Sequence, residues 1–148
     1  MSKRVNTLNG PDRNKLLRLV FGASGYIGSH LVPYLRTRGI PVRAASRRRE
    51  VLEAREWDGV ETCAADALDP ASLAAALGRV DTAYYLVHSM AAGRHFGQTD
   101  LQAAANFTAA AEAAGVRRIV YLGGLVPDDA DSEHITSRRD TGDQLRQG

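Results

Sequence analysis

Several features are scarce or absent in this 148-residue sequence, and each absence excludes a class of protein. A single cysteine, Cys63, rules out an internal disulfide and argues against a structural zinc site. No apolar run approaches the roughly 20 residues that span a bilayer, and the polar, basic start lacks the apolar segment of a secretory signal. Nineteen basic and 17 acidic residues leave a net charge of +2, too balanced to indicate nucleic acid or a membrane surface as partner. We therefore expect a cytoplasmic protein.

The composition is that of one ordinary globular domain. Hydrophobic residues make up 44% of the chain and charged residues 24%, close to the average for globular proteins. The length is enough for one hydrophobic core and leaves no room for a second domain of ordinary size. Residues 1–15 are polar and contain the turn-forming Asn9-Gly10-Pro11. We expect a flexible N-terminal tail over 1–15 and one domain over 16–148.

Short apolar runs alternate with stretches of helical periodicity along the whole domain. Asp69-Pro70 is a typical helix start, with the carboxylate at the N-cap and proline in the first turn. The runs are apolar on both faces, which is typical of a parallel sheet covered on both sides by helices in three α/β/α layers. The pattern predicts strands over 16–21, 41–45, 60–64, 82–87 and 119–122, and helices over 26–38, 50–57, 70–77, 98–114 and 133–146. In the alanine-rich helix, the face of Leu101, Ala105 and Ala109 is expected to pack on the sheet or, alternatively, to form an interface.

The most informative motif is a glycine-rich turn between the first predicted strand and the first predicted helix. Gly22 permits a tight turn, Gly25 allows a pyrophosphate to approach the backbone, and Gly28 allows close packing of helix on strand. The helix N-terminus offers unpaired N–H groups to the phosphates. This context predicts a doubly wound Rossmann fold, although glycines could also serve an ordinary turn. The predicted cofactor contacts of this turn are Gly22, Ala23, Ser24, Gly25, Tyr26, Ile27 and Gly28.

The end of the second predicted strand indicates which nucleotide is bound. Rossmann domains that prefer NAD place an acidic residue there, to bind the ribose hydroxyls. This sequence instead reads Ser46-Arg47-Arg48-Arg49. Guanidinium groups and a hydroxyl suit a 2′-phosphate, so the sequence favours NADP(H) over NAD(H), with Ser46, Arg47 and Arg48 as contacts. The alternative is a solvated basic surface.

Longer segments resemble a known family. The stretch LVFGASGYIGSHLV (19–32), with its GxxGxxG spacing, resembles the short-chain dehydrogenase/reductase superfamily. YYLVHSM (84–90), AAEAAGVRRIVYLGGL (110–125) and the isolated positions Phe96, Asp100, Asn106-Phe107, His134 and Ser137-Arg138 resemble its atypical NmrA-like NAD(P)H-binding group. The resemblance covers residues 16–146, nearly the whole chain.

The resemblance implies further cofactor contacts. Asp66 matches the family's acidic residue near the adenine amine, with the Ala67 backbone beside it, although Asp66 could equally serve a turn. Leu86, Val87 and His88 match positions along the ribose and nicotinamide, although the first two could be plain core residues.

The standard catalytic groups of the superfamily are missing. No tyrosine has a lysine four residues later, and Gly123-Gly124 stands where a catalytic serine is usual. His134 could replace the tyrosine as proton donor, and Arg138, four residues on, could supply the fixed positive charge of the lysine. The alternative is a surface helix that carries a histidine and an arginine. No histidine pair has the spacing of a metal site.

Related proteins continue beyond this point into a substrate-binding portion, so the resemblance implies a truncated chain. The flank of the fifth strand would then expose apolar surface to a second copy or a protein partner. The implied function is an NADP-dependent oxidoreductase domain acting on an unknown carbonyl or quinone-like substrate. The alternatives are a non-catalytic NAD(P)H-sensing or scaffold module and an inactive fragment.

Overall fold

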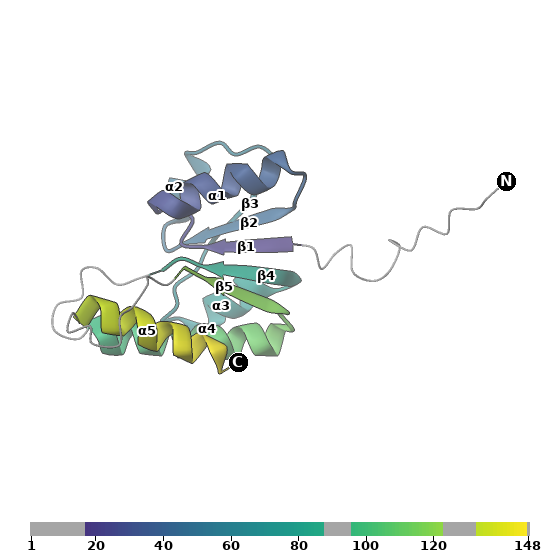
Figure 1. Ribbon diagram of the computed structural model, residues 1–148. Helices are drawn as coiled ribbons and strands as arrows, with labels where there is room; N and C mark the ends of the chain where they lie inside the picture. The colour runs from purple at the N-terminus through teal and green to yellow at the C-terminus, as the bar shows by residue number, and fades with distance from the viewer. Residues whose placement is uncertain (1–16, 88–95, 123–132, 148) are drawn as a thin grey trace.

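The computed structural model describes residues 17–87, 96–122 and 133–147 (Figure 1). Strands and helices alternate along the described chain without exception. Within these ranges, no helix has both the length and the apolar character needed to cross a bilayer. The elements are β1 (Leu17–Phe21), α1 (Tyr26–Thr37), β2 (Val42–Ser46), α2 (Arg49–Glu53), β3 (Glu61–Ala64), α3 (Pro70–Leu77), β4 (Val80–Tyr85), α4 (Phe96–Ala114), β5 (Arg118–Tyr121) and α5 (Glu133–Arg146).

The five strands form one parallel sheet in the order β3-β2-β1-β4-β5. Helices α1 and α2 cover one face, and α3, α4 and α5 cover the other (Figure 1). Strand β1 lies in the middle of the sheet, with β2 on one side and β4 on the other. The helix that follows β1 packs on one face and the helix that follows β4 packs on the opposite face. The predicted three-layer Rossmann fold is confirmed, and a sheet of this kind binds ligands beyond its carboxyl edge.

Two apolar clusters hold the layers together. On the α1 side, Val20 of β1 and Val42 of β2 pack against Val32 and Leu35 of α1. On the other side, Phe21, Tyr85 and Phe107 form an aromatic group of tilted and edge-to-face rings with centroids 4.8–5.6 Å apart. Because β1 and β2 are buried on both faces, their sequences show no polar alternation.

Some boundaries differ from the sequence-based expectation. Helix α2 ends at Glu53 rather than near Trp57, because Glu56 adopts a left-handed conformation with φ of 52°. Strand β4 ends at Tyr85, two residues before the expected end. Asp69 caps α3 as predicted, its carboxylate accepting from the Ala71 N–H at 3.2 Å.

The expected inner face of α4 was wrong. The structure buries Ala103, Ala104, Phe107 and Ala111, whereas Ala109 is exposed and Leu101 and Ala105 are half-buried. An alanine-rich helix has similar residues on every side, so its sequence does not define one apolar stripe. The expected apolar surface on β5 is present, since Leu122, just after the strand, is 62% exposed and Val120 is 36% exposed.

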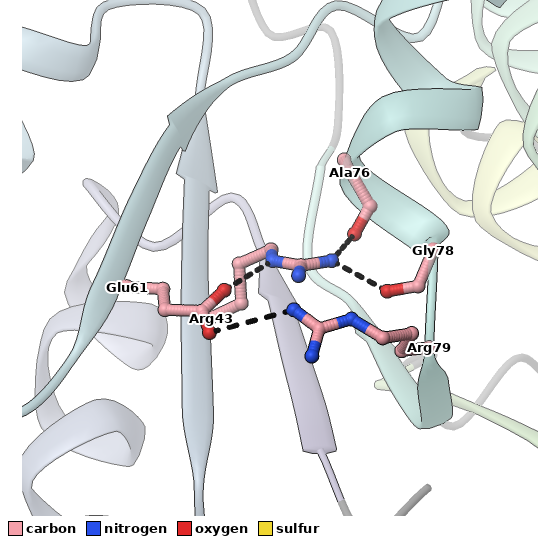
Figure 2. A network of polar contacts seen from close by, with 5 residues as sticks. All are labelled: Arg43, Glu61, Ala76, Gly78 and Arg79. Atoms are coloured by element: carbon pink, nitrogen blue, oxygen red, sulfur yellow. Dashed lines mark hydrogen bonds and ion pairs between the residues drawn. The ribbon is translucent and has the colours of Figure 1, made fainter. Parts of the chain in front are cut away.

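A buried arginine joins the two layers at the amino-terminal edge of the sheet. Figure 2 shows the Arg43 guanidinium reaching from β2 to the end of α3. Its Nε donates to Glu61 Oε2 at 2.9 Å, and its Nη1 donates to the carbonyls of Ala76 at 2.6 Å and Gly78 at 2.8 Å. Arg79 approaches the other Glu61 oxygen at 4.0 Å. Arg43 thereby gives a donor to two carbonyls at the end of α3 that have no helical partner.

Candidate functional site

The glycine turn lies at the carboxyl edge of the sheet, between β1 and α1. The N–H groups of Gly22 and Ala23 both donate to the Ala45 carbonyl, at 3.0 and 3.1 Å, and so tie the turn to β2. Gly22 has φ of +94°, and a Cβ there would lie 2.9 Å from the Leu86 carbonyl oxygen. Glycine is therefore required at this position by both backbone conformation and space.

Gly28 brings α1 into contact with the turn. A Cβ at Gly28 would lie 2.5 Å from the Gly22 oxygen and 2.7 Å from the Ala23 Cα. Both neighbours are backbone atoms, so no side chain could move aside. Gly28 thus has the close-packing role predicted from its spacing.

Gly25 differs from the other two glycines because the protein itself leaves room beside it. A Cβ at Gly25 would make only an ordinary contact, 3.5 Å from the Gly22 oxygen. Gly25 is the N-cap of α1, and no side chain caps the helix or places an acid in its first turn. The first helical hydrogen bond runs from the Ser29 N–H to the Gly25 carbonyl, so the preceding N–H groups have no helical partner. Open space beside uncapped N–H groups fits a phosphate group.

A second polar group lies beside this turn, at the end of β2. The buried Ser46 hydroxyl donates to the Ser24 hydroxyl at 3.3 Å and accepts from the Arg48 N–H at 3.3 Å. The structure therefore joins the turn and the β2 end, which are about 20 residues apart in sequence. Hydroxyl and N–H groups that meet at a strand end suit an anionic ligand.

The three arginines after β2 differ in their partners. Arg48 Nε donates to Glu50 Oε1 at 2.9 Å, and Arg49 Nε donates to Glu53 Oε1 at 2.8 Å. In the described part of the chain, no ion pair or hydrogen bond involves the exposed Arg47 side chain. Of the three, Arg47 is the cation available to a ligand, whereas Arg48 already has a counter-ion.

The segment after β3 is organised as a turn. The Asp66 Oδ1 accepts from the Leu68 N–H at 2.9 Å, and the Ser72 hydroxyl bonds both the N–H and the carbonyl of Asp66. The carbonyl of the buried Ala67 accepts a hydrogen bond from the Asn106 side-chain amide at 2.8 Å. The turn alternative for Asp66 is thus realised, and its adenine contact stays a prediction.

The residues after β4 lie against the glycine turn. The Leu86 N–H donates to the Phe21 carbonyl at 2.8 Å, and the Leu86 side chain packs with the α1-side cluster. Val87 packs against the opposite cluster, and its Cγ2 would lie 3.2 Å from a Cβ at Gly22. Both residues lie at the carboxyl edge of the sheet, beside Gly22. His88 lies outside the described residues.

The predicted catalytic pair lies on α5, whose first turn is on the side of the sheet where the strands end (Figure 1). The helix confirms that His134 and Arg138 are one turn apart, but their side chains are outside the described part of the structure. Tyr85 lies in the core instead: its ring packs against Phe21, Phe107 and Tyr121, and burial raises the pKa of its hydroxyl above the ordinary value.

Two residues with a bearing on the site were missed in the sequence. Glu50 was assigned only to a short helix, although an acid two positions after Arg48 is within reach of its side chain. Asn106 was noted only as a family match, and its bond to the Ala67 carbonyl spans 39 residues. No local pattern predicts such a long-range contact.

Comparison with known proteins identifies the family to which this site belongs. A profile described as NAD(P)H-binding matches residues 22–145, from the first glycine of the turn to the end of α5. The chain belongs to the NAD(P)H-binding family. The resemblance drawn from the glycine turn and the later segments is thereby confirmed at the level of an NAD(P)H-binding domain.

Two curated proteins and one solved structure illustrate what this chain is similar to. The chain is 32% identical over 128 residues to cinnamoyl-CoA reductase 1 of Oryza sativa, covering 82% of this chain and 38% of that protein. It is 34% identical over 109 residues to an NAD(P)H azoreductase of Xenophilus azovorans, covering 72% and 35% of the two chains. Its fold matches triphenylmethane reductase of Citrobacter sp., solved with NADP(H), with a TM-score of 0.76 at 23% identity, covering 88% and 45%. The chain thus spans less than half the length of each of these proteins.

Proposed function

We propose that this domain binds NADP(H) in preference to NAD(H) and is the nucleotide-binding part of an oxidoreductase. The observation that supports the preference is the group at the end of β2, where the Ser24 and Ser46 hydroxyls meet beside an unpaired Arg47 and no acid ends the strand. An acid there would accept from the ribose hydroxyls of NAD and repel a 2′-phosphate. A guanidinium with two hydroxyls instead provides donors for that phosphate.

The other residues have complementary roles in this proposal. The turn around Gly25 and the first N–H groups of α1 hold the pyrophosphate. Asp66 and Ala67 lie beside the adenine, and Leu86, Val87 and His88 lie along the nicotinamide half. The bound cofactor supplies a hydride, and the protein supplies its orientation.

The proposed acceptor is a carbonyl or quinone-like compound, and its identity is set by chain segments other than those that hold the nucleotide. The names of the two reductases and of triphenylmethane reductase agree on reduction and differ in the compound reduced. In such a reaction His134 would give a proton to the acceptor, and Arg138 would place a fixed positive charge beside it. Substituting His134→Ala should lower turnover, followed as the loss of absorbance at 340 nm in single-turnover experiments, at least about a hundredfold. The affinity for NADPH should not change. Equal turnover in both proteins would remove His134 from the mechanism, whereas tight NADPH binding without turnover of any tested acceptor would favour the sensing alternative.

The nucleotide preference is tested by titrating the protein with NADPH and NADH at matched salt and following nicotinamide fluorescence. We expect NADPH to bind at least about tenfold more tightly than NADH, because one good charge-assisted contact is worth about that factor. Arg47→Ala should remove most of this difference by weakening NADPH alone.

The matched control is Arg117→Ala, which removes the same charge from an exposed position before β5, where its nearest ion pair is a loose 3.7 Å contact with Asp81. If Arg117→Ala weakens NADPH as much as Arg47→Ala does, the effect is general electrostatics rather than a phosphate site. Failure of the wild-type domain to bind either nucleotide would refute the proposed function.

A further inference from the structure

The two glutamates of α2 divide the arginines after β2 into one free cation and two paired ones. Glu50 accepts from Arg48, and Glu53 accepts from Arg49, each through a guanidinium Nε within 3.0 Å. This division depends on the glutamates alone, since Arg47, Arg48 and Arg49 are all exposed. Any ligand that recruits Arg48 must first separate it from Glu50.

Arg48 is the paired arginine that stands nearest to the proposed phosphate position. Its backbone N–H bonds the Ser46 hydroxyl, which in turn bonds Ser24. Its side chain is 73% exposed and that of Glu50 is 65% exposed, so no packing holds either in place. The pair is maintained by its own hydrogen bond.

We propose that Glu50 is a specificity-determining residue: by holding the Arg48 guanidinium, it limits how strongly this domain prefers NADPH to NADH. The inference rests on the proposed NADP(H) function. It assigns a role to a residue that would not touch the nucleotide itself. Arg47 is then the arginine that contacts the 2′-phosphate. Arg48 is a second cation that cannot contact the phosphate while it is paired with Glu50.

Two physical effects act in the same direction. First, Glu50 competes with the phosphate for the Arg48 guanidinium. Second, the negative charge of Glu50, 2.9 Å from that guanidinium, repels a phosphate that approaches it. The bond from Arg48 lowers the pKa of Glu50, so the carboxylate stays charged at neutral pH. A repulsive element of this kind weakens one of two competing ligands more than the other, which is how specificity is commonly adjusted. NADH lacks the 2′-phosphate and should not respond.

Glu53 provides a matched comparison on the same helix. Its partner Arg49 lies one turn earlier on α2, and among the described residues Arg49 has no hydrogen bond to Ser24 or Ser46. Removing the Glu53 charge therefore frees an arginine that, unlike Arg48, is not hydrogen-bonded to Ser46.

The test compares Glu50→Gln with Glu53→Gln by titration with NADPH and NADH, and with adenosine 2′,5′-bisphosphate as a probe of the adenosine end alone. Glu50→Gln should tighten NADPH and the bisphosphate about three- to tenfold, the range for an exposed charge next to a phosphate, and leave NADH unchanged. Glu53→Gln should change none of the three by more than about twofold. In an Arg48→Ala background, most of the gain from Glu50→Gln should disappear.

The outcomes separate this inference from the proposed function. If Arg47→Ala weakens NADPH but Glu50→Gln leaves the NADPH-to-NADH ratio unchanged, only the role of Glu50 is refuted. The same holds if Glu50→Gln and Glu53→Gln have equal effects, or if the gain persists without Arg48. If Arg47→Ala has no effect on NADPH, the phosphate site itself is wrong, and the role of Glu50 falls with it. Matching far-ultraviolet circular dichroism establishes that the variants are folded.

Discussion

Gly25→Ala should weaken dinucleotide binding at least about thirtyfold in a domain that remains fully folded. The added methyl group meets only the Gly22 oxygen, at 3.5 Å, and Gly25 has φ of −75°, which alanine adopts without strain. The methyl group would occupy the space through which a pyrophosphate reaches the N–H groups of α1. Losing one charge-assisted hydrogen bond to a phosphate costs about 2 kcal/mol, so NADPH affinity should fall at least about thirtyfold.

Gly28→Ala should mainly lower the stability of the domain, whereas Gly25→Ala should mainly lower its affinity for the nucleotide. Its methyl group would lie 2.5 Å from the Gly22 oxygen and 2.7 Å from the Ala23 Cα, so α1 must move away from β1. Overpacking against backbone costs about 1–3 kcal/mol, and here the displaced helix also buries Val32 and Leu35. We expect the free energy of unfolding to fall by about 3 kcal/mol or folding to be lost.

Urea unfolding and fluorescence titration of both variants separate binding from stability. Gly97→Ala is the control, because a Cβ at this α4 position has no neighbour within 4 Å among the described residues. It should leave affinity unchanged and stabilise the helix by up to about 1 kcal/mol. A Gly25→Ala variant that binds NADPH normally would mean that the phosphates do not approach this turn. A Gly28→Ala variant as stable as the wild type would contradict the packing described for α1.

Much of the fold could be predicted because the deciding interactions are local. The strands of the sheet are short apolar runs, Asp69 is a helix cap, and the glycines have fixed spacing. The failures occurred where local sequence carries no signal. The left-handed conformation of Glu56, which ends the α2 region, is rare for a residue with a side chain, and an alanine-rich helix such as α4 has no distinct apolar stripe.

In the candidate site, too, the features that depend on residues close in sequence could be predicted, and those that depend on distant residues could not. The roles of Gly22 and Gly28 depend on residues close in sequence and were predicted correctly. The contact of Ser24 with Ser46 depends on two loops that meet only when β1 and β2 pair. The pairing of Arg48 with Glu50 is local, yet a run of arginines alone indicates only positive charge. Which arginine is free to bind a ligand is a property of the folded chain.

Arg43→Met should lower the free energy of unfolding while leaving the nucleotide site untouched. Arg43 is 7% exposed and donates to two carbonyls at the end of α3 as well as to Glu61 (Figure 2). Methionine retains much of the apolar length but leaves those carbonyls without a donor. A buried acceptor that loses its partner costs about 1–3 kcal/mol, so we expect a loss of about 3 kcal/mol in urea unfolding.

The cause of that loss can be assigned by comparing Arg43→Lys with Glu61→Gln. Lysine keeps the charge but cannot reach Glu61 and both carbonyls at once, so it should recover only part of the stability. Glu61 is 53% exposed, and its pairing contributes less than about 1 kcal/mol. A large effect of Glu61→Gln would mean that the ion pair, and not the α3 carbonyls, is the main stabilising contact. Since Arg43 lies at the edge of the sheet opposite the glycine turn, the folded fraction of each variant should bind NADPH with unchanged affinity.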